Sequence, residues 1–530
     1  MKFVARHPFA WRWALSSLLL FAVTLMWSIA SPVPSGPDEQ AQLIKSAAVA
    51  HGVVVGTPHP TRHAQGTVIV KVPALIQSAS KRAACDYQIF RPASCSARLD
   101  TSGQMVTVTT YEGRYPPIYY FLTGLPTLVG HSAWVLHAMR AVSALLVSLL
   151  FGMAFAAAAT WGRSNLLLIS MAVTLTPAAL YIGSVVNPSA MEIAGGVLLW
   201  AALTVLFLYE AKDPPRTLVA AVVVGAVALC ASRPLSTGFF ALIVATLVAL
   251  RPATARALIR LRRIQVAFVA SFGFAFISGL FVLYAKSYEV EAFPIHNRST
   301  LDFVIAVVGH GNKVLRQLVG SFGAPNFVDP TPVLVVWFVA GFGLIFLGML
   351  LARRRDAVVL LIVFALFGFL LPFAIAYSHV RTDGIIWQGR YSLPLIAGLP
   401  MLGGVLISER HPRGVAAVRR RAGGIVLLGL VFGWIAGFYW VLRRYTVGLS
   451  YHATNAFRHD PGYWAPVIPA IAVFAILVLA TLGFAVWVYR ESDLAGRRIL
   501  EPLPETQSPP VAPLASSRVN RTAASSAQPL

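Results

Sequence analysis

Two adjacent carboxylates, Asp38 and Glu39, directly follow the first long apolar stretch of the chain. A Ser35-Gly36-Pro37 turn precedes them, and a helix-like run follows as far as His51. Acidic residues in the first turn of a helix often only cap it or balance its dipole. A carboxylate at the mouth of a membrane cavity can instead act as a general base on a hydroxyl group. These residues alone leave both interpretations open.

The elements that must position these carboxylates are apolar helices. Of 530 residues, 57% are hydrophobic and only 12% are charged, which is the composition of a polytopic membrane protein. A net charge of +23 in a soluble chain would suggest a nucleic-acid partner. Here the basic residues cluster in short loops between apolar stretches, where membrane orientation explains them. We therefore expect membrane lipids, and no nucleic acid, as partners.

The apolar stretches predict an all-α polytopic membrane protein with about twelve transmembrane helices. A basic cytoplasmic N-terminus, 1–12, precedes a first transmembrane helix at 13–30, and the remaining spans lie within 134–489. The Pro-, Ser- and Ala-rich end of the chain cannot bury enough apolar surface to fold, so 490–530 is expected to be a disordered cytoplasmic tail.

Arginine placement predicts the orientation. Segments 251–263, 353–355 and 410–421 are rich in arginine, and the positive-inside rule puts them in the cytoplasm. Both termini are then cytoplasmic, in a multi-pass protein of the cytoplasmic (inner) membrane. The expected outer loops are 31–133, 286–330, 378–390 and 443–463.

The first outer loop, 31–133, is large enough to form a small subdomain. We expect interfacial helices at 38–51 and 117–129, the second being too short to cross a bilayer. Two β-branched runs, Thr67–Val72 and Gln104–Thr110, favour a short sheet. Cys85 and Cys95 share this loop and would form a disulfide in an oxidising compartment, although two free thiols remain an alternative.

Most polar residues that look out of place fall at the expected outer ends of the spans. They are Tyr115, His137, Arg140, Asn187, Glu192, Arg233, His379, Gln388, Arg390 and Tyr391. Arginines there could bind a lipid phosphate, whereas a structural ion pair or an interfacial aromatic and basic belt would also explain several of them. A divalent cation could bind nearby acidic groups, but no ligand spacing is diagnostic and no metal ligand is assigned.

Five short motifs stand in a characteristic order and spacing along the chain. They are SGPDEQAQ at 35–42, YPPIYY at 115–120, NPSAME at 187–192, SRP at 232–234 and QGRYSLPL at 388–395. With them, residues 13–489 resemble a bacterial membrane-protein family known as domain of unknown function 2142. That family looks related to the GT-C glycosyltransferases, whose members use polyprenyl-phosphate sugars.

The resemblance implies a GT-C-like fold and an inverting sugar transfer. Asp38 matches the acidic residue that serves as base in the first outer loop, with Glu39 beside it as a second catalytic candidate. Arg140 matches an arginine that recurs among relatives, and Ser189 stands where relatives often place an acid after Asn-Pro. The implied partners are a polyprenyl-phosphate sugar donor and an envelope glycan, lipid or protein acceptor.

Two other classes of function remain open from the sequence. One is a lipid or polysaccharide transporter or flippase, which would place ionisable groups near the middle of the membrane. The other is a non-catalytic membrane protein of envelope assembly. The scarcity of charge inside the predicted spans favours sugar transfer over transport.

Overall fold

The computed structural model describes most of the chain. The described residues are 7–60, 66–82, 89–94, 98–208, 213–289, 299–323, 327–381, 384–410, 416–450, 455–458 and 463–498. The predicted disulfide between Cys85 and Cys95 and the tail beyond residue 498 lie outside them.

Nine helices in the described part of the chain are long and apolar enough to cross a membrane. They are α2 (Pro8–Ile29), α6 (Trp134–Trp161), α9 (Pro188–Leu208), α13 (Arg262–Tyr284), α15 (Thr331–Leu351), the run of α16 (Arg354–Ala365), η4 (Leu366–Leu370) and α17 (Leu371–His379), the pair α18 (Gly389–Ile396) and α19 (Gly398–Arg410), α20 (Ala416–Thr446) and α21 (Ala470–Arg498). The protein is therefore an all-α polytopic membrane protein in which a sheet is a minor element.

Three further predicted spans depart from a straight, full-length helix. α7 (Asn165–Thr174) and α8 (Pro177–Ser184) meet at a 61° bend, and α11 (Ser236–Leu250) and α12 (Pro252–Leu258) meet at 109°. Each bend has a proline at the start of its second helix, where the preceding residue is driven out of helical geometry. The third, α10 (Arg216–Cys230), is apolar but short.

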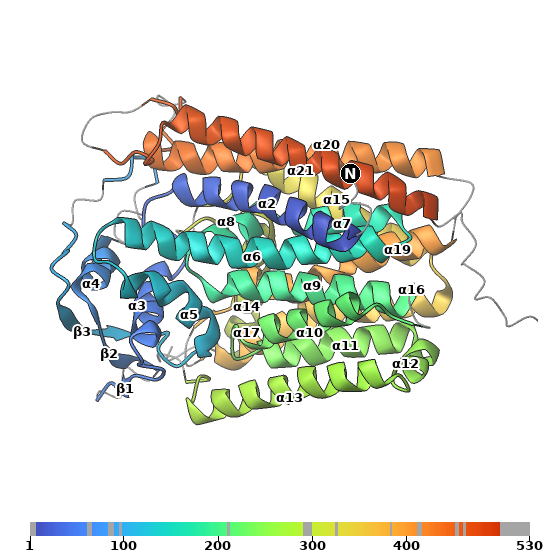
Figure 1. Cartoon of the computed structure of the whole chain (residues 1–530), viewed down its shortest axis with the longest axis horizontal. Helices are drawn as coiled ribbons and strands as arrows, with labels where there is room; N and C mark the ends of the chain where they lie inside the picture. Colours follow the sequence, from blue (N-terminus) through green and yellow to red (C-terminus); the bar gives the residue numbers. More distant parts are fainter. Residues whose placement is uncertain are drawn as a thin grey trace, which may run out of the picture.

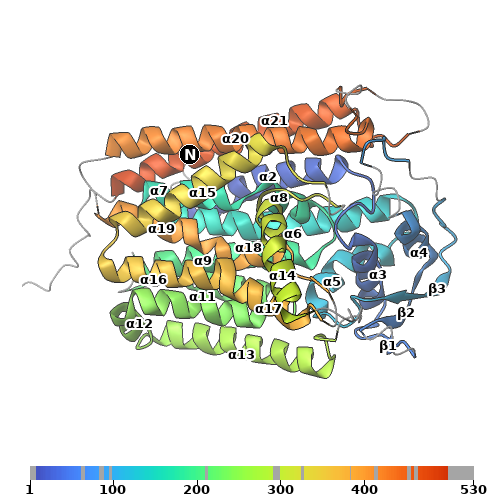
Figure 2. The ribbon, with the colours of Figure 1, turned by 180° about the vertical axis from the view of Figure 1, so that it is seen from behind.

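The spanning helices run side by side, with the small subdomain at one end of the bundle (Figure 1). α12 and the start of α16, which carry arginine-rich segments, lie at the other end (Figures 1 and 2). We call these two ends the subdomain end and the arginine end. α9 is almost wholly buried at the centre of the bundle, whereas α13 lies on its outside with many exposed apolar side chains.

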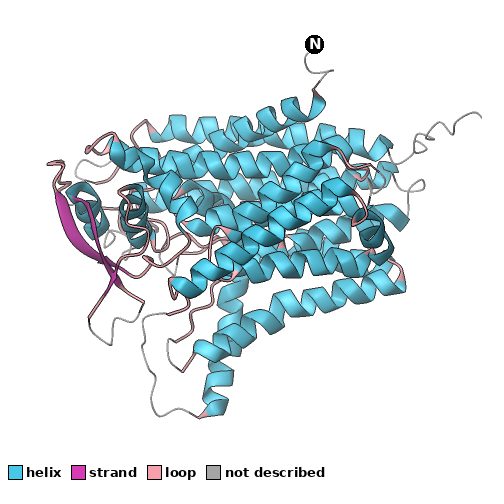
Figure 3. Cartoon of the chain, turned by 60° about the horizontal axis from the view of Figure 1, so that its bottom comes forward, coloured by secondary structure: helices cyan, strands magenta, loops and turns pink. Residues whose placement is uncertain are grey.

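The subdomain combines a three-stranded antiparallel sheet with short helices (Figure 3). The strands are β1 (Thr57–Pro58), β2 (Val68–Pro73) and β3 (Met105–Thr110), so the two β-branched runs pair with each other. Its helices are α3 (Glu39–Ala50), α4 (Ala74–Ser80), α5 (Pro117–Gly124) and η3 (Leu125–Leu128). α3 and the α5–η3 pair lie close to the ranges predicted for interfacial helices.

One further helix, α14 (Thr300–Val319), crosses the bundle at a steep angle instead of running along it (Figure 2). Ser299 and Asp302 form a capping box that starts it. Apolar side chains such as Phe303 and Val307 are buried, whereas the polar side chains of Asn312 and Lys313 are exposed. This amphipathic pattern suits a helix in the plane of the membrane surface.

Close packing of α2 on α6 depends on Gly152. A β-carbon at this position would lie 2.1 Å from the Ser17 hydroxyl oxygen and 2.8 Å from the Ser17 backbone nitrogen. The carbonyl of Gly152 also accepts a 3.1 Å hydrogen bond from Ser16. The absence of a side chain therefore lets the first helix lie against the bundle core.

We expect Gly152→Val to lower the thermal stability of the detergent-purified protein, because α2 must move off α6 to admit the new side chain. An overpacked core site costs about 1–3 kcal/mol. The matched control is Gly273→Val on α13, where a β-carbon would meet nothing within 4 Å. Equal melting temperatures for the two variants would contradict this account of the α2–α6 contact.

Candidate functional site

Glu39 and Arg140 form a fully buried ion pair. The Arg140 Nη2–Glu39 Oε2 distance is 2.6 Å and both side chains have 0% exposure. Glu39 also accepts hydrogen bonds from the backbone N–H groups of Ser35, Gly36 and Val186. Burial alone would raise the pKa of Glu39, but Arg140 and these hydrogen bonds outweigh it and hold the pKa low.

The remaining N–H groups of Arg140 donate hydrogen bonds to carbonyls at the end of α2. Nη1 donates to the carbonyls of Ser28 and Ser31, and Nη2 donates to the carbonyl of Pro32. With its donors directed at protein acceptors, Arg140 has the geometry of a structural residue. Of the two readings left open by the sequence, the contacts favour the structural pair.

Asp38 points away from its neighbour Glu39 and meets a different arginine. Asp38 adopts a left-handed backbone conformation (φ 59°, ψ 8°) at the start of α3, and its side chain makes no capping hydrogen bond. Arg390 Nη2 lies 2.5 Å from Asp38 Oδ2, and the hydroxyl of Tyr111 donates to Oδ1 at 3.2 Å. The Asp38 side chain is 33% exposed, so it is the accessible carboxylate of the two.

The guanidinium groups of Arg233 and Arg390 both lie against the ring of Tyr391. Arg233 Cζ is 4.0 Å from the Tyr391 ring centroid and Arg390 Cζ is 5.0 Å from it. Arg233 donates to the Ser189 hydroxyl at 3.1 Å and to the Tyr115 hydroxyl at 3.5 Å. Such stacked guanidiniums are well suited to bind phosphate oxygens.

Glu192 is buried below these arginines, on α9. Its Oε1 accepts a 2.7 Å hydrogen bond from Ser236, and its Oε2 has no hydrogen-bond partner among the described residues. Asn187 is close to Glu192 in sequence, but its side chain contacts the turn before α3. Its amide group donates a 2.8 Å hydrogen bond to the Pro37 carbonyl. Asn187 therefore holds the turn that leads into Asp38.

A third carboxylate, Glu112, is part of this region and was not among the residues predicted from the sequence. It lies in the turn after β3, is 6% exposed, and hydrogen-bonds with Gln42 of α3. Burial, followed by the negative charge of Asp38, raises the pKa of Glu112 to about 7. The only sequence signal was an acid three residues before the Tyr-Pro-Pro motif, and acids in turns are usually solvated.

Lys45 of α3 is also buried here. Its ammonium group donates to the carbonyls of Val54 and Gly113 at 2.6 Å each. Burial lowers the pKa of Lys45 to about 7, although the nearby Glu112 carboxylate acts in the opposite direction. Lys45 therefore ties α3 to the turn that carries Glu112.

We call the ionisable and hydroxyl side chains at this point the polar cluster. Its members are Asp38, Tyr111, Glu112, Tyr115, Ser189, Glu192, Arg233, Ser236, Arg390 and Tyr391. They come from the subdomain, the starts of α9 and α18 and the α10–α11 turn, all at the subdomain end. The cluster can bind an anion and offers carboxylates for proton transfer.

Three candidates from the sequence lie outside this cluster. His137 is half-buried on α6 and His379 ends α17. Gln388 precedes α18, and its backbone carbonyl accepts a hydrogen bond from the N–H of Tyr391. In the part of the chain that the structure describes, no three His, Cys, Asp or Glu side chains are grouped so that they could hold a metal ion.

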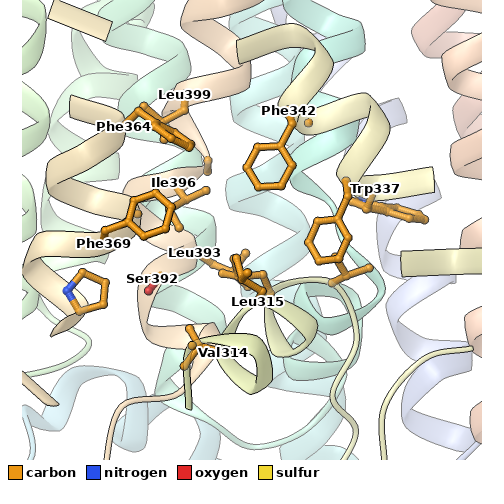
Figure 4. Close-up of a pocket in the computed structure, with 18 of the residues that line it drawn as sticks. Val314, Leu315, Trp337, Phe342, Phe364, Phe369, Ser392, Leu393, Ile396 and Leu399 are labelled. Carbon is orange, nitrogen blue, oxygen red and sulfur yellow. The ribbon is translucent and has the colours of Figure 1, made fainter. Parts of the chain in front are cut away.

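An apolar cavity of about 520 Å³ lies between α14, α15, η4 and α18 (Figure 4). Phe342, Phe364 and Phe369 line it, together with Leu393 and Ile396 of the helix that carries Arg390. Trp387 and Ser392, which flank Arg390 in the sequence, also line the cavity. An apolar chain in this cavity would therefore lie next to the helix that carries one of the cluster's arginines.

The fold and the cluster define a polytopic membrane protein with a buried polar site at one end of its helix bundle. The chain belongs to the family of predicted membrane proteins DUF2142, whose model matches residues 21–399. No protein of curated function matches the sequence. Among solved structures, ArnT from Cupriavidus metallidurans bound to undecaprenyl phosphate is similar, at 14% identity and a TM-score of 0.40 over 93% of this chain and 78% of that one.

We expect Glu39→Ala to destabilise the protein strongly, because Arg140 would be left as an unpaired buried charge. Breaking a buried pair in this way costs about 3–5 kcal/mol. The control is Asp493→Ala, which removes the partly exposed ion pairs of Asp493 with Arg497 and Arg420. Thermal unfolding in detergent should separate the two variants widely, and similar melting temperatures would refute the structural role of Glu39.

Proposed function

We propose that the protein is a membrane glycosyltransferase of GT-C type. It transfers a sugar from a polyprenyl-phosphate donor to an envelope acceptor on the outer face of the cytoplasmic membrane. The observation that carries the proposal is the meeting of Asp38 with Arg390 beside Arg233. An accessible carboxylate next to the buried Arg390 and the partly buried Arg233 supplies both a base and a phosphate site.

The donor phosphate binds Arg233 and Arg390 in this mechanism. Phosphate oxygens compete with Asp38 for the Arg390 guanidinium, so donor binding loosens the Asp38–Arg390 ion pair. Asp38 then has a carboxylate oxygen available for the acceptor hydroxyl. The base is thus freed only when the donor is in place.

Transfer proceeds as a single displacement with inversion at the anomeric carbon. Asp38 takes the proton of the acceptor hydroxyl while the acceptor oxygen forms a bond to that carbon. The bond from the same carbon to the phosphate oxygen breaks, and its electron pair leaves with the polyprenyl phosphate. Arg233 and Arg390 stabilise the charge that develops on the departing phosphate.

The apolar cavity beside α18 supports a lipid-linked donor rather than a free sugar phosphate. Its phenylalanine-rich lining has few groups that could bind a sugar, whereas it would accept part of a hydrocarbon chain. α14 covers one side of the cavity with residues such as Val307 and Val314. Leu301 and Ile305 of the same helix are exposed apolar side chains that suit contact with the outer leaflet.

Asp38→Asn should abolish most of the sugar transfer while leaving the protein folded, because the amide keeps the shape of the side chain but cannot take the proton. General-base catalysis is worth roughly 10²–10⁴-fold. The assay follows labelled sugar from polyprenyl phosphate into envelope material, with thermal stability measured alongside. Asp213→Asn, at an 86% exposed side chain remote from the cluster, is the control. Full activity of Asp38→Asn would exclude this base.

Gly341→Leu should weaken the binding of a lipid-linked donor, because Gly341 lines the cavity and the new side chain would fill part of it. The effect of a few lost methylene contacts is about tenfold on KM for the lipid donor, with kcat less affected. Gly343→Leu, two residues along α15 and open to the outside, is the matched control. An unchanged KM in Gly341→Leu would remove the cavity from the donor site.

A further inference from the structure

The turn that carries Glu112 is held rigidly against the sheet and the bundle. A β-carbon on Gly113 would lie 1.9 Å from a methyl group of Val68, so the turn packs directly on β2. The next residue, Arg114, pairs with Glu289, and its carbonyl accepts a hydrogen bond from Ser287. Glu112 is therefore placed at a fixed position facing the bundle.

The Glu112 carboxylate has an unused acceptor directed into a buried region. Its Oε2 has no hydrogen-bond partner within the described ranges, and the same is true of Arg390 Nε and Glu192 Oε2. Buried donors and acceptors without hydrogen-bond partners destabilise the folded protein. A ligand or a proton that binds to these groups would remove this cost.

Several charged and titratable groups face Glu112 from the elements around it. They are Asp38, Gln42 and Lys45 of the α3 region, Tyr111 and Tyr115 on either side of it in the chain, Tyr120 of α5, Arg233 of the α10–α11 turn and Arg390 of α18. Glu112 is thus one of three carboxylates, with Asp38 and Glu192, that share the two guanidinium groups of the cluster.

We propose that binding of a phosphate monoester to Arg233 and Arg390 is coupled to the uptake of one proton by Glu112. This inference rests on the proposed function, since it takes the same two arginines as the phosphate site. The proton that is taken up when the phosphate binds is one that the transfer reaction itself does not require.

The coupling follows from the charge balance of the cluster. In the ligand-free protein the guanidiniums offset part of the cost of a charged Glu112, and its pKa is about 7. A bound phosphate takes over those guanidiniums and adds negative charge beside the carboxylate. Both effects favour the neutral form of Glu112, so the phosphate and a proton bind together.

The affinity for the phosphate is therefore expected to fall as the pH rises. Above about pH 7 the ligand-free protein has Glu112 ionised, so each binding event must take a proton from solution. The affinity for phosphate then falls by about tenfold for each pH unit above 7, until the pKa of Glu112 in the complex is reached. Below about pH 6 the phosphate monoester itself loses charge, so the informative range is about pH 7 to 9.

The test measures binding of farnesyl phosphate to the detergent-purified full chain by calorimetry over that range. The wild type should lose affinity with rising pH and take up close to one proton, seen as a heat that depends on the ionisation enthalpy of the buffer. Glu112→Gln, which mimics the neutral acid, should bind with an affinity that hardly changes between about pH 7 and 9. A pH slope that persists in Glu112→Gln would overturn the proposal.

Lys45 titrates in the same range and is the main competing source of a pH slope. Lys45→Met should keep the slope if Glu112 is responsible, and loss of the slope there with its retention in Glu112→Gln would assign it to Lys45. Infrared difference spectra give a readout that needs no variant, because farnesyl phosphate should produce a protonated-carboxyl band in the wild type at about pH 8. Absence of that band would overturn the coupling.

The two proposals fail in different ways. If farnesyl phosphate binds equally well to the wild type and to Arg233→Met and Arg390→Met, the phosphate site of the proposed function is wrong. If binding needs both arginines but shows no pH slope above about 7, the phosphate site stands and only the role of Glu112 is refuted. Asp213→Asn, at an exposed side chain remote from the cluster, should behave as the wild type.

Discussion

The buried ion pair between Glu39 and Arg140 fixes the geometry on which the polar cluster depends. Arg140 donates to three carbonyls at the end of the first helix. Glu39 accepts hydrogen bonds from the backbone N–H groups of Ser35 and Gly36, just before Pro37, and of Val186, just before α9. One pair therefore joins α2, α3, α6 and α9. Because the charges neutralise each other and their hydrogen bonds are satisfied, the pair can remain in a low-dielectric interior. The position of Asp38 follows from it, since Asp38 is the residue immediately before.

Asp38 and Glu39 can have different roles although they are adjacent, because the backbone turns sharply between them. Glu39 begins the helix and points into the bundle, whereas Asp38 has positive φ and directs its carboxylate toward Arg390. Aspartate tolerates this conformation better than most residues. Asp38 makes no cap for the helix, so its placement is not explained by helix stability. A residue held in a sparsely populated conformation and paired with a distant arginine is a reasonable candidate for chemistry.

Apolar length and β-branched patterning were enough to predict the spanning segments and the small sheet. These features depend on local composition, and so does the bend at each proline in α8 and α12. The sequence also pointed to Asp38, Arg233 and Arg390. It could not show that Arg140 pairs with Glu39 and does not join the other two arginines in the polar cluster. That distinction depends on which face of each helix meets which neighbour. Glu112 was missed for a related reason, because only the tertiary fold buries an acid that its turn would otherwise expose.

The distribution of ionisable groups favours transfer over transport. A transporter that alternates access needs coupling groups near the middle of the membrane, reachable from both sides in turn. In the described residues, the second large group of charges, Arg251 with Asp356 and Glu409, lies at the arginine end of the bundle and is separated from the polar cluster by apolar helices. The cluster is covered by the subdomain and is reached through the partly exposed Asp38. A site open at one end suits a reaction in which donor and acceptor arrive from the same side and one product leaves in the membrane.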